Sequence, residues 1–307
     1  MNNQRIEKTT GIRAAQYLAL IFLTVCLSPF VFVRAIDSDA ELIETGSAKK
    51  VDAKRTVPGE IKIVSFNMRW RGGDDLSALI KLLKEDKEIG GAAVIGLQEV
   101  DRDKKRTANT NTARKMAEEL GVHYAWAAPP PAEGKERDEE ETGVAILSPF
   151  PLTDVTRIVL PNPGPGGRRR VALGATVQIG DKRLRAYSVH AETRTTNEKR
   201  IEQLKAVLDD LQSNHAKVKY AVVLGDFNTV TGKDRNATSR LFSDKEFLTP
   251  FSIDEPTWRT FIIKLKLDWL WLRGGFEVKE YGIDRKIEMS DHWPLWAVVS
   301  LKDGKGS

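Results

Sequence analysis

The sequence predicts an α/β (α+β) protein in which two β-sheets stack face to face and helices cover their outer sides. Three observations support this fold class. Runs of strand length that are apolar or alternating recur along most of the chain, and only a few segments have helical spacing. The 307 residues suit one large domain. Many strands in meander-like order with few helices are typical of two packed sheets with outer helices.

The expected strands begin after a charged N-terminal region and continue almost to the end of the chain. Residues 170–179 and 182–190 flank Gly180-Asp181, a dipeptide that favours a tight β-hairpin. The full set of predicted strands is 61–67, 92–99, 123–127, 144–147, 155–160, 170–179, 182–190, 221–224, 265–272, 276–281 and 295–301.

Three amphipathic helices are predicted where apolar residues recur three and four positions apart. The first covers 76–83, the second covers 111–120 and the third covers 201–211. Gly121 is expected to end the second helix, because glycine adopts the left-handed conformation that closes helices.

The N-terminal region divides into two expected segments. Residues 1–35 combine a basic start, an apolar run and a small residue at Ala35, a pattern typical of a signal peptide, or of a membrane anchor if it is not cleaved. Residues 36–57 are charged and without periodicity, which indicates a flexible linker. The domain is then expected over 58–303. A secreted or periplasmic protein follows, or a membrane-anchored one with its domain outside the cytoplasm, which touches the membrane only through this segment.

Charge and cysteine content set few limits on function. The formal net charge is +5, and Arg5, Lys8, Arg13 and Arg34 against Glu7 place +3 of it in the first 35 residues. The rest is too balanced to indicate nucleic acid by charge alone. The single cysteine, in the N-terminal segment, excludes an intrachain disulfide and a cysteine metal site.

Polar residues stand at the ends of five predicted strands, which is where α/β enzymes gather their chemistry. A turn is the alternative explanation for each one taken singly, but the recurrence favours one convergent site. The residues are Asn67, Gln98 and Glu99, His190, Asp226 and Asn228, and Asp291 and His292.

The ordered set of these segments resembles the endonuclease/exonuclease/phosphatase superfamily, the deoxyribonuclease-I-like metal-dependent phosphoesterases. The resemblance covers roughly residues 58–302 and implies a four-layer α/β sandwich, two packed, mainly antiparallel β-sheets flanked by helices, with the site at one end of the sheets. The matching segments are Ser65–Asn67, Leu97–Glu99, Thr142–Ser148, Val189-His190, Gly225–Asn228, Leu267–Leu270 and Ser290–His292.

The expected metal ligands are oxygen donors. Glu99 offers a hard carboxylate, and Mg²⁺ typically takes one or two carboxylates plus water and substrate oxygens. Asn67 would add a neutral oxygen, and the resemblance implies that Asp291 lies near the metal too. We therefore expect Mg²⁺, with Mn²⁺ as an alternative.

The expected base is His292, because histidine titrates near neutral pH. Such a base needs a carboxylate to orient it. Asp268 lies within an apolar strand, where an unpaired charge is costly, and the family pattern supplies His292 as its partner.

The resemblance implies roles for four further residues. Asp226 would orient the nucleophile or protonate the leaving group, and Asn228 would bond to the phosphate. His190 would donate to a phosphate oxygen or protonate the leaving oxygen, and Arg170 would contact the phosphate. The sequence departs from the family at Ser188-Val-His190 and adds Glu192 to the following loop.

These features predict an exported, Mg²⁺-dependent phosphoesterase that is a monomer and acts on a phosphodiester. A nuclease is favoured because Arg168–Arg170 and Trp70 would suit a nucleic-acid backbone and stacked bases. The alternatives are a phospholipid or inositol-phosphate phosphatase, a sphingomyelinase-like phosphodiesterase, and a non-catalytic binding module on the same fold.

Overall fold

The computed structural model describes residues 41–51, 56–132, 135 and 140–302. The predicted signal peptide or anchor of residues 1–35 lies outside these ranges, as do residues 36–40 and 52–55 of the predicted linker. The unit described here by itself falls within residues 38–307.

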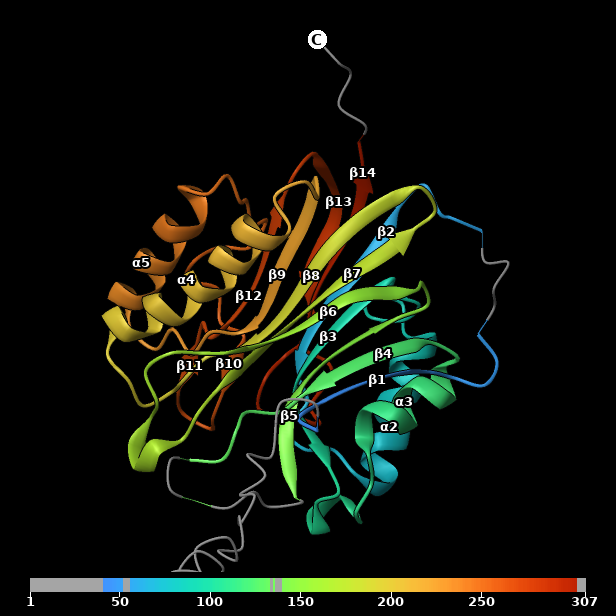
Figure 1. The fold of residues 1–307 in the computed structure, drawn as a ribbon, viewed down its shortest axis with the longest axis horizontal. Helices are drawn as coiled ribbons and strands as arrows, with labels where there is room; N and C mark the ends of the chain where they lie inside the picture. Colours follow the sequence, from blue (N-terminus) through green and yellow to red (C-terminus); the bar gives the residue numbers. More distant parts are fainter. Residues whose placement is uncertain (1–40, 52–55, 133–134, 136–139, 303–307) are drawn as a thin grey trace, which may run out of the picture. The chain divides into compact units, whose positions relative to one another are not determined.

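The described domain contains two large β-sheets (Figure 1). The first has the order β1-β4-β5-β3-β2-β14-β13, and the second has the order β12-β9-β8-β7-β6. The strands of the first sheet are β1 Ile43–Ser47, β2 Ile61–Asn67, β3 Val94–Arg102, β4 His123–Ala127, β5 Glu141–Ser148, β13 Phe276–Ile283 and β14 Leu295–Leu301. The strands of the second are β6 Leu152–Val159, β7 Val171–Ile179, β8 Lys182–His190, β9 Tyr220–Asp226 and β12 Asp268–Arg273. A separate hairpin joins β10 Trp258–Arg259 to β11 Lys264–Leu265.

Helices cover the outer face of each sheet. Helices α2 (Gly73–Glu85) and α3 (Thr112–Leu120) pack on the seven-stranded sheet, and α4 (Asn197–Asn214) and α5 (Gly232–Ser243) pack on the five-stranded sheet (Figure 1). Two short 3₁₀ helices, Lys105–Thr107 and Pro165–Gly167, lie in loops. Three apolar clusters fill the spaces between the four layers, and the central cluster joins the facing sheets. The predicted four-layer sandwich is confirmed.

Local sequence signals explain most of these elements. Asn111 caps α3 through its side chain, and Gly121 ends this helix at φ 69°, as predicted. The expected hairpin is present, with Ile179 paired to Lys182 across the turn. Each sheet is antiparallel except for one parallel pair, β2 with β3 and β8 with β9.

The main differences between the prediction and the structure lie in three segments. Residues 43–47 of the predicted linker form β1, which pairs with β4 at the edge of the sheet. Helix α5 is absent from the prediction because its sequence has few apolar residues, although Thr231 and Asp234 form a capping box at its start. The single strand predicted over 265–272 is divided into β11 and β12, because the Thr257 hydroxyl accepts the N–H groups of Leu267 and Asp268.

The strand pairing gathers the polar strand ends at one place. In the register of the sheets, Asn67 lies opposite Gln98, and Asp226 lies opposite both His190 and Asp268. Neighbouring parallel strands have their carboxyl ends at the same edge of a sheet. This explains why polar residues at the ends of separate predicted strands meet at one site.

Among the residues that the structure describes, no helix combines the length and the apolar character needed to cross a membrane.

The two sheets approach each other closely at Gly96 of β3. A Cβ atom at this position would lie 2.0 Å from Leu224 Cδ1 of β9, a buried side chain of the facing sheet. We expect Gly96→Ala to lower the free energy of unfolding by about 1–3 kcal/mol, the usual cost of overpacking. Gly59→Ala is the matched control because nothing lies within 4 Å of its added Cβ. Equal urea midpoints for the two variants would contradict this account of the sheet packing.

Candidate active site

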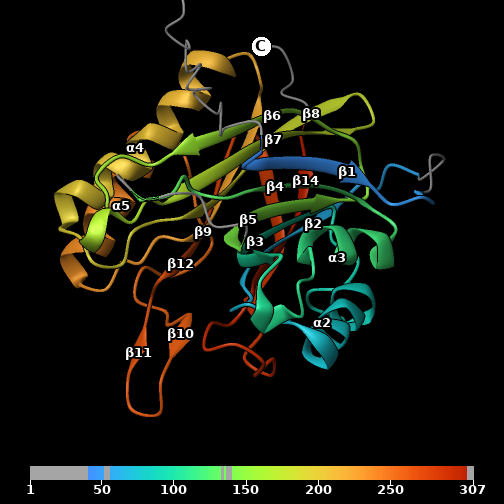
Figure 2. The ribbon, with the colours of Figure 1, turned by 60° about the horizontal axis from the view of Figure 1, so that its bottom comes forward.

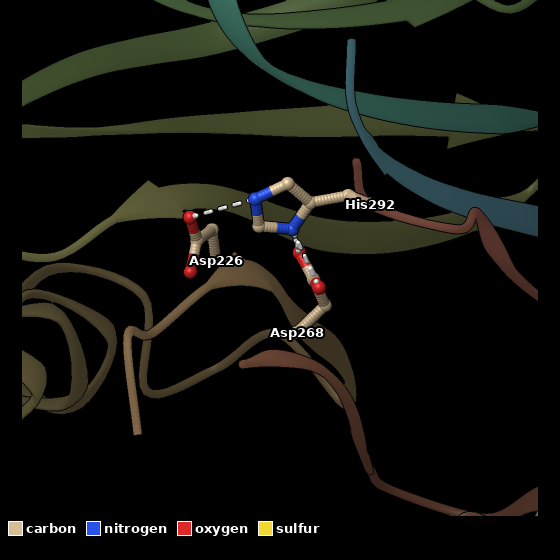
Figure 3. Close-up of side chains that lie close together, drawn as sticks. All are labelled: Asp226, Asp268 and His292. Carbon is tan, nitrogen blue, oxygen red and sulfur yellow. Dashed lines mark hydrogen bonds and ion pairs between the residues drawn. The ribbon is translucent and has the colours of Figure 1, made fainter. Parts of the chain in front are cut away.

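Three buried side chains form the centre of the site (Figure 3). His292 Nδ1 lies 2.8 Å from Asp268 Oδ2 and 3.1 Å from Asp268 Oδ1. The opposite ring nitrogen, Nε2, lies 3.8 Å from Asp226 Oδ2. The imidazole therefore stands between two carboxylates, one that fixes its orientation and one that faces its free nitrogen.

Two hydroxyl groups that the sequence prediction missed fix the backbone at Asp268 and at His292. Thr257 Oγ1 accepts the backbone N–H of Asp268 at 2.9 Å. Ser290 Oγ donates to the carbonyl of Asn67 at 2.8 Å and accepts the backbone N–H of His292 at 3.2 Å. Ser290 belongs to the recognised Ser-Asp-His segment, whereas no sequence signal marks Thr257. Both are positioning residues.

Asp226 is held by its own turn and by Asn67. Gly225 bends the strand at φ 134°, where an added Cβ would lie 2.1 Å from the Val189 carbonyl, so only glycine fits. Asp226 Oδ1 accepts the backbone N–H of Asn228 at 3.0 Å. Its Oδ2 atom accepts a hydrogen bond from Asn67 Nδ2 at 3.1 Å and faces His190 Nε2 at 3.6 Å.

Glu99 approaches the same centre from the other sheet. It lies at a bulge of β3, between Gln98 and Val100, with a positive φ of 56°. A bulge turns a side chain away from the regular alternation and is common beside active sites. Glu99 Oε1 accepts a hydrogen bond from Asn67 Nδ2 at 3.3 Å. One amide therefore joins the carboxylates of Glu99 and Asp226.

The basic residues next to His190 are partly neutralised by a buried carboxylate. Arg170 Nη1 lies 3.4 Å from His190 Nδ1, and its Nε atom lies 3.3 Å from Glu192 Oε2. Glu192 is fully buried and also pairs with Arg168. The acidic residue that departs from the family thus compensates two of the three arginines in the basic loop.

Ser188, the other departure from the family, joins the two sheets beneath the site. Its Oγ atom donates to the carbonyl of Leu97 at 3.0 Å and accepts a hydrogen bond from Gln98 Nε2 at 3.0 Å. Both partners lie on β3, next to Glu99. This position therefore supports the bulge from which Glu99 enters the site.

Asn228 and Asp291 lie at the margin of the centre. The Asn228 amide donates to the Ala191 carbonyl at 3.0 Å, which joins the loop after β9 to the loop after β8. The Asp291 carboxylate accepts a hydrogen bond from Trp258 Nε1 at 3.0 Å and pairs with Arg69 at 3.2 Å. It borders a cleft of about 470 Å³ whose lining includes Arg69, Arg71, Arg259, Phe261, Ser290 and Asp291.

The electrostatics of the centre follow from burial and from close charges. Burial raises the pKa of Asp226 to about 7, and the carboxylates of Asp268 and Glu99 add to this effect while His292 opposes it. Burial alone would lower the pKa of His292, but the carboxylates of Asp268 and Asp226 raise it to about 9. Burial and the Arg170 guanidinium hold the pKa of His190 well below its usual value.

The donor set fits a hard divalent cation. Glu99, Asp226 and Asp268 place three carboxylates around one centre, and the Asn67 amide joins the first two. Single ligand atoms of Asp226, Asp268 and His292 lie within 4.8 Å of one another. Because His292 and Asp268 already bond to each other, the Glu99 carboxylate is the better place for a cation such as Mg²⁺. Asn67 turns its amide nitrogen toward Glu99 and Asp226, and its oxygen accepts the Arg69 N–H at 3.2 Å.

Comparison with known proteins identifies a family with a similar sequence. The profile of the Endonuclease/Exonuclease/phosphatase family matches residues 64–292, about three quarters of the chain. No curated protein matches significantly.

Solved structures are similar in fold at low sequence identity. An endonuclease/exonuclease/phosphatase from Beutenbergia cavernae DSM 12333 is 19% identical with a TM-score of 0.64, over 80% of this chain and 72% of that chain. ANGEL2, a 2′,3′-cyclic phosphatase, is 16% identical with a TM-score of 0.61, over 79% of this chain and 95% of that chain. The human Nocturnin catalytic domain with a bound sulfate anion is 18% identical with a TM-score of 0.60, over 86% and 99%.

The raised pKa of His292 predicts a pH-dependent stability in EDTA. The folded protein keeps this proton up to about pH 9, whereas the unfolded chain releases it near 6.5. The folded state therefore binds more protons between these values, and the free energy of unfolding must fall as pH rises from 7 to 9. We expect His292→Asn to reduce this fall, which is on the order of 1–3 kcal/mol.

The control is His123→Gln, because burial lowers the pKa of His123 and removes its titration from this pH range. Urea unfolding at several pH values measures both variants. A fall for His292→Asn as steep as that of the unmodified protein would show that the raised pKa is wrong.

Proposed function

Because this chain belongs to the endonuclease/exonuclease/phosphatase family, whose members are metal-dependent hydrolases, we propose that it is an exported, Mg²⁺-dependent phosphodiesterase. The observation that carries the proposal is the placement of His292 between Asp268 and Asp226, with Glu99 joined to Asp226 through Asn67. Intact groups at all these positions favour an enzyme over a non-catalytic binding module. Mn²⁺ is the alternative cation.

The residues divide the work of phosphodiester hydrolysis. Glu99 would hold Mg²⁺, with Asp291 beside it, and the cation would supply charge neutralisation at the phosphate. Asn67 would join as a ligand through its amide oxygen, which here accepts the Arg69 N–H. Asp268 fixes the tautomer of His292, so that the Nε2 atom faces the centre. In the role of base, His292 takes a proton from water once the nearby negative charge is compensated.

The proton for the leaving oxygen has a separate source. Asp226, with a pKa of about 7, carries a proton part of the time near neutral pH, which suits a proton donor. His190 stays neutral, because burial and Arg170 disfavour its charged form, and it can donate one hydrogen bond to a phosphate oxygen. Arg170 beside it adds a positive charge.

The substrate class is the second part of the proposal. The nuclease prediction relied on the arginine loop and on Trp70. Glu192 compensates Arg168 and Arg170, and Trp70 is only 37% exposed with the Arg106 guanidinium 4.2 Å from its ring centroid. These contacts weaken the case for a nucleic-acid groove. A phospholipid head group is favoured instead by the exposed apolar residues Phe261–Ile263, which lie between β10 and β11 and of which Phe261 lines the cleft.

The catalytic assignment predicts large losses of activity. We expect His292→Ala and Asp226→Ala each to lower kcat on bis(4-nitrophenyl) phosphate with Mg²⁺ by about 10²–10⁴-fold, the usual contribution of one acid–base group. His215→Ala is the control, because His215 is the C-cap of α4, outside the described site. Variants as active as the unmodified protein would refute the enzyme proposal.

The metal assignment predicts a shift in Mg²⁺ dependence. We expect Glu99→Gln to raise the Mg²⁺ concentration for half-maximal activity by about 10–100-fold, because the hard carboxylate is lost. It should also abolish most of the Mg²⁺-induced rise in melting temperature, which needs no turnover. Glu198→Gln, at the exposed start of α4, is the control. An unchanged Mg²⁺ response for Glu99→Gln would exclude Glu99 as a ligand.

A further inference from the structure

The loop between β10 and β11 exposes three consecutive apolar side chains. Phe261 is 104% exposed, Ile262 is 88% exposed and Ile263 is 53% exposed. Figure 2 shows the hairpin projecting from the rest of the domain. Single apolar residues on a surface are common, but a contiguous group marks an interaction site. We call Phe261–Ile263 the hairpin tip.

The hairpin tip has a defined conformation. Thr260 N–H donates to the Ile263 carbonyl at 2.8 Å, and the Thr260 hydroxyl accepts the N–H groups of Ile262 at 3.3 Å and Ile263 at 3.0 Å. These bonds close the turn without using the three apolar side chains. The exposure of the tip is therefore built into an ordered turn.

Backbone bonds connect the hairpin directly to the catalytic loop. Arg259 N–H donates to the Asp291 carbonyl at 2.9 Å, and Trp293 N–H donates to the Thr257 carbonyl at 2.8 Å. These bonds flank His292, and Trp258 forms an isolated β-bridge with it. Any surface that receives the tip is thus held in a fixed position relative to His292.

The charge around the tip favours an anionic surface. No acidic residue occurs from Pro256 to Leu267, and Arg259 and Lys264 flank the tip. The cleft beside the tip is lined by Arg69 and Arg71 and also by the acidic Glu288 and Asp291, which pair with Arg259 at 2.9 Å and with Arg69 at 3.2 Å. Among the described residues, Lys264 is therefore the cation next to the tip that has no acidic partner. Apolar residues next to cations are typical of segments that lie in the head-group region of a bilayer.

We propose that the hairpin tip inserts into the surface of an anionic lipid bilayer and brings the active site to the phosphodiesters of lipid head groups. The shape and composition of the tip support this partner. A convex tip can bind only a deformable surface, such as a bilayer, or a surface with a matching cavity. Two of its three side chains are aliphatic and offer no ring for stacking on bases, which disfavours nucleic acid. The substrate part rests on the proposed phosphodiesterase, whereas the docking part does not.

A fluorescent label can test the docking without catalysis. The chain has one cysteine, Cys26, so Cys26→Ser provides a background in which Ile262→Cys carries the only thiol. The probe is an environment-sensitive fluorophore on this thiol, measured in EDTA with vesicles of phosphatidylcholine and phosphatidylserine. The control is Leu248→Cys, because Leu248 is 47% exposed and pairs with Leu272 at the far end of β12 from Asp268.

We expect the label at 262 to shift to the blue and brighten at least twofold with these vesicles, less with phosphatidylcholine alone, and the label at 248 to stay unchanged. The 1–35 segment is present in both proteins, so its own binding cannot produce this difference. An unshifted label at 262, or equal shifts at both positions, would overturn the proposal. A shift with protein concentration alone or with single-stranded DNA, and none with vesicles, would overturn it in favour of self-association or nucleic acid.

The substrate part needs a second measurement. We expect Ile262→Ser/Ile263→Ser to lower the ratio of phospholipid-vesicle hydrolysis to bis(4-nitrophenyl) phosphate hydrolysis at least about tenfold, because two apolar side chains no longer enter the lipid. Leu248→Ser is the control. An unchanged ratio would overturn the link between docking and substrate. Failure of the unmodified protein to hydrolyse either substrate with Mg²⁺ would instead overturn the proposed function.

Discussion

The buried pair of Asp268 and His292 is the constraint on which the site depends. Asp268 begins β12 of the five-stranded sheet, and His292 lies just before β14 of the seven-stranded sheet. The pair therefore joins the two halves of the sandwich through a contact between charged groups. Removing one member of such a pair leaves a buried charge without a partner, which typically costs about 3–5 kcal/mol. Thr257 and Ser290 fix the orientation of this pair, because their hydroxyls accept the backbone N–H groups of Asp268 and His292.

Further polar contacts cross between the sheets at the same end. Asn67 of the first sheet bonds to Asp226 of the second, and Gln98 bonds to Ser188. Apolar packing joins the sheets elsewhere, through the central cluster. The domain thus replaces apolar contacts by hydrogen bonds where its chemistry occurs. The result is an electronegative centre in a buried setting, where a divalent cation is strongly favoured.

The fold and the membership of the site were largely predictable from local sequence patterns. Strands that end on Asn67, Glu99, His190 and Asp226 meet because the pairing of neighbouring strands brings their ends to one edge, and this consequence follows from topology alone. The structure brings all four residues together, while their catalytic and metal-binding roles stay predictions. Strand β1 was not predictable, because its sequence lacks alternation and its stability comes from pairing with β4.

Side-chain partners could not be read from the sequence. Glu192 looks like a loop residue, yet it is buried against Arg168 and Arg170, which come from a segment more than twenty positions earlier. The orientation of Asp291 toward Trp258 depends in the same way on a distant loop. Such pairings form only when separate elements pack together, so composition and residue spacing do not predict them.

The position of β14 between β2 and β13 has a consequence for the order in which the protein matures. His292 precedes this strand, and its partners lie as far back along the chain as Asn67, whose carbonyl binds Ser290. A ribosome-bound chain that has not yet released its final strand has no assembled catalytic centre. Hydrolytic capacity is consequently the last property gained during biosynthesis, so the chain stays inert while it is still incomplete.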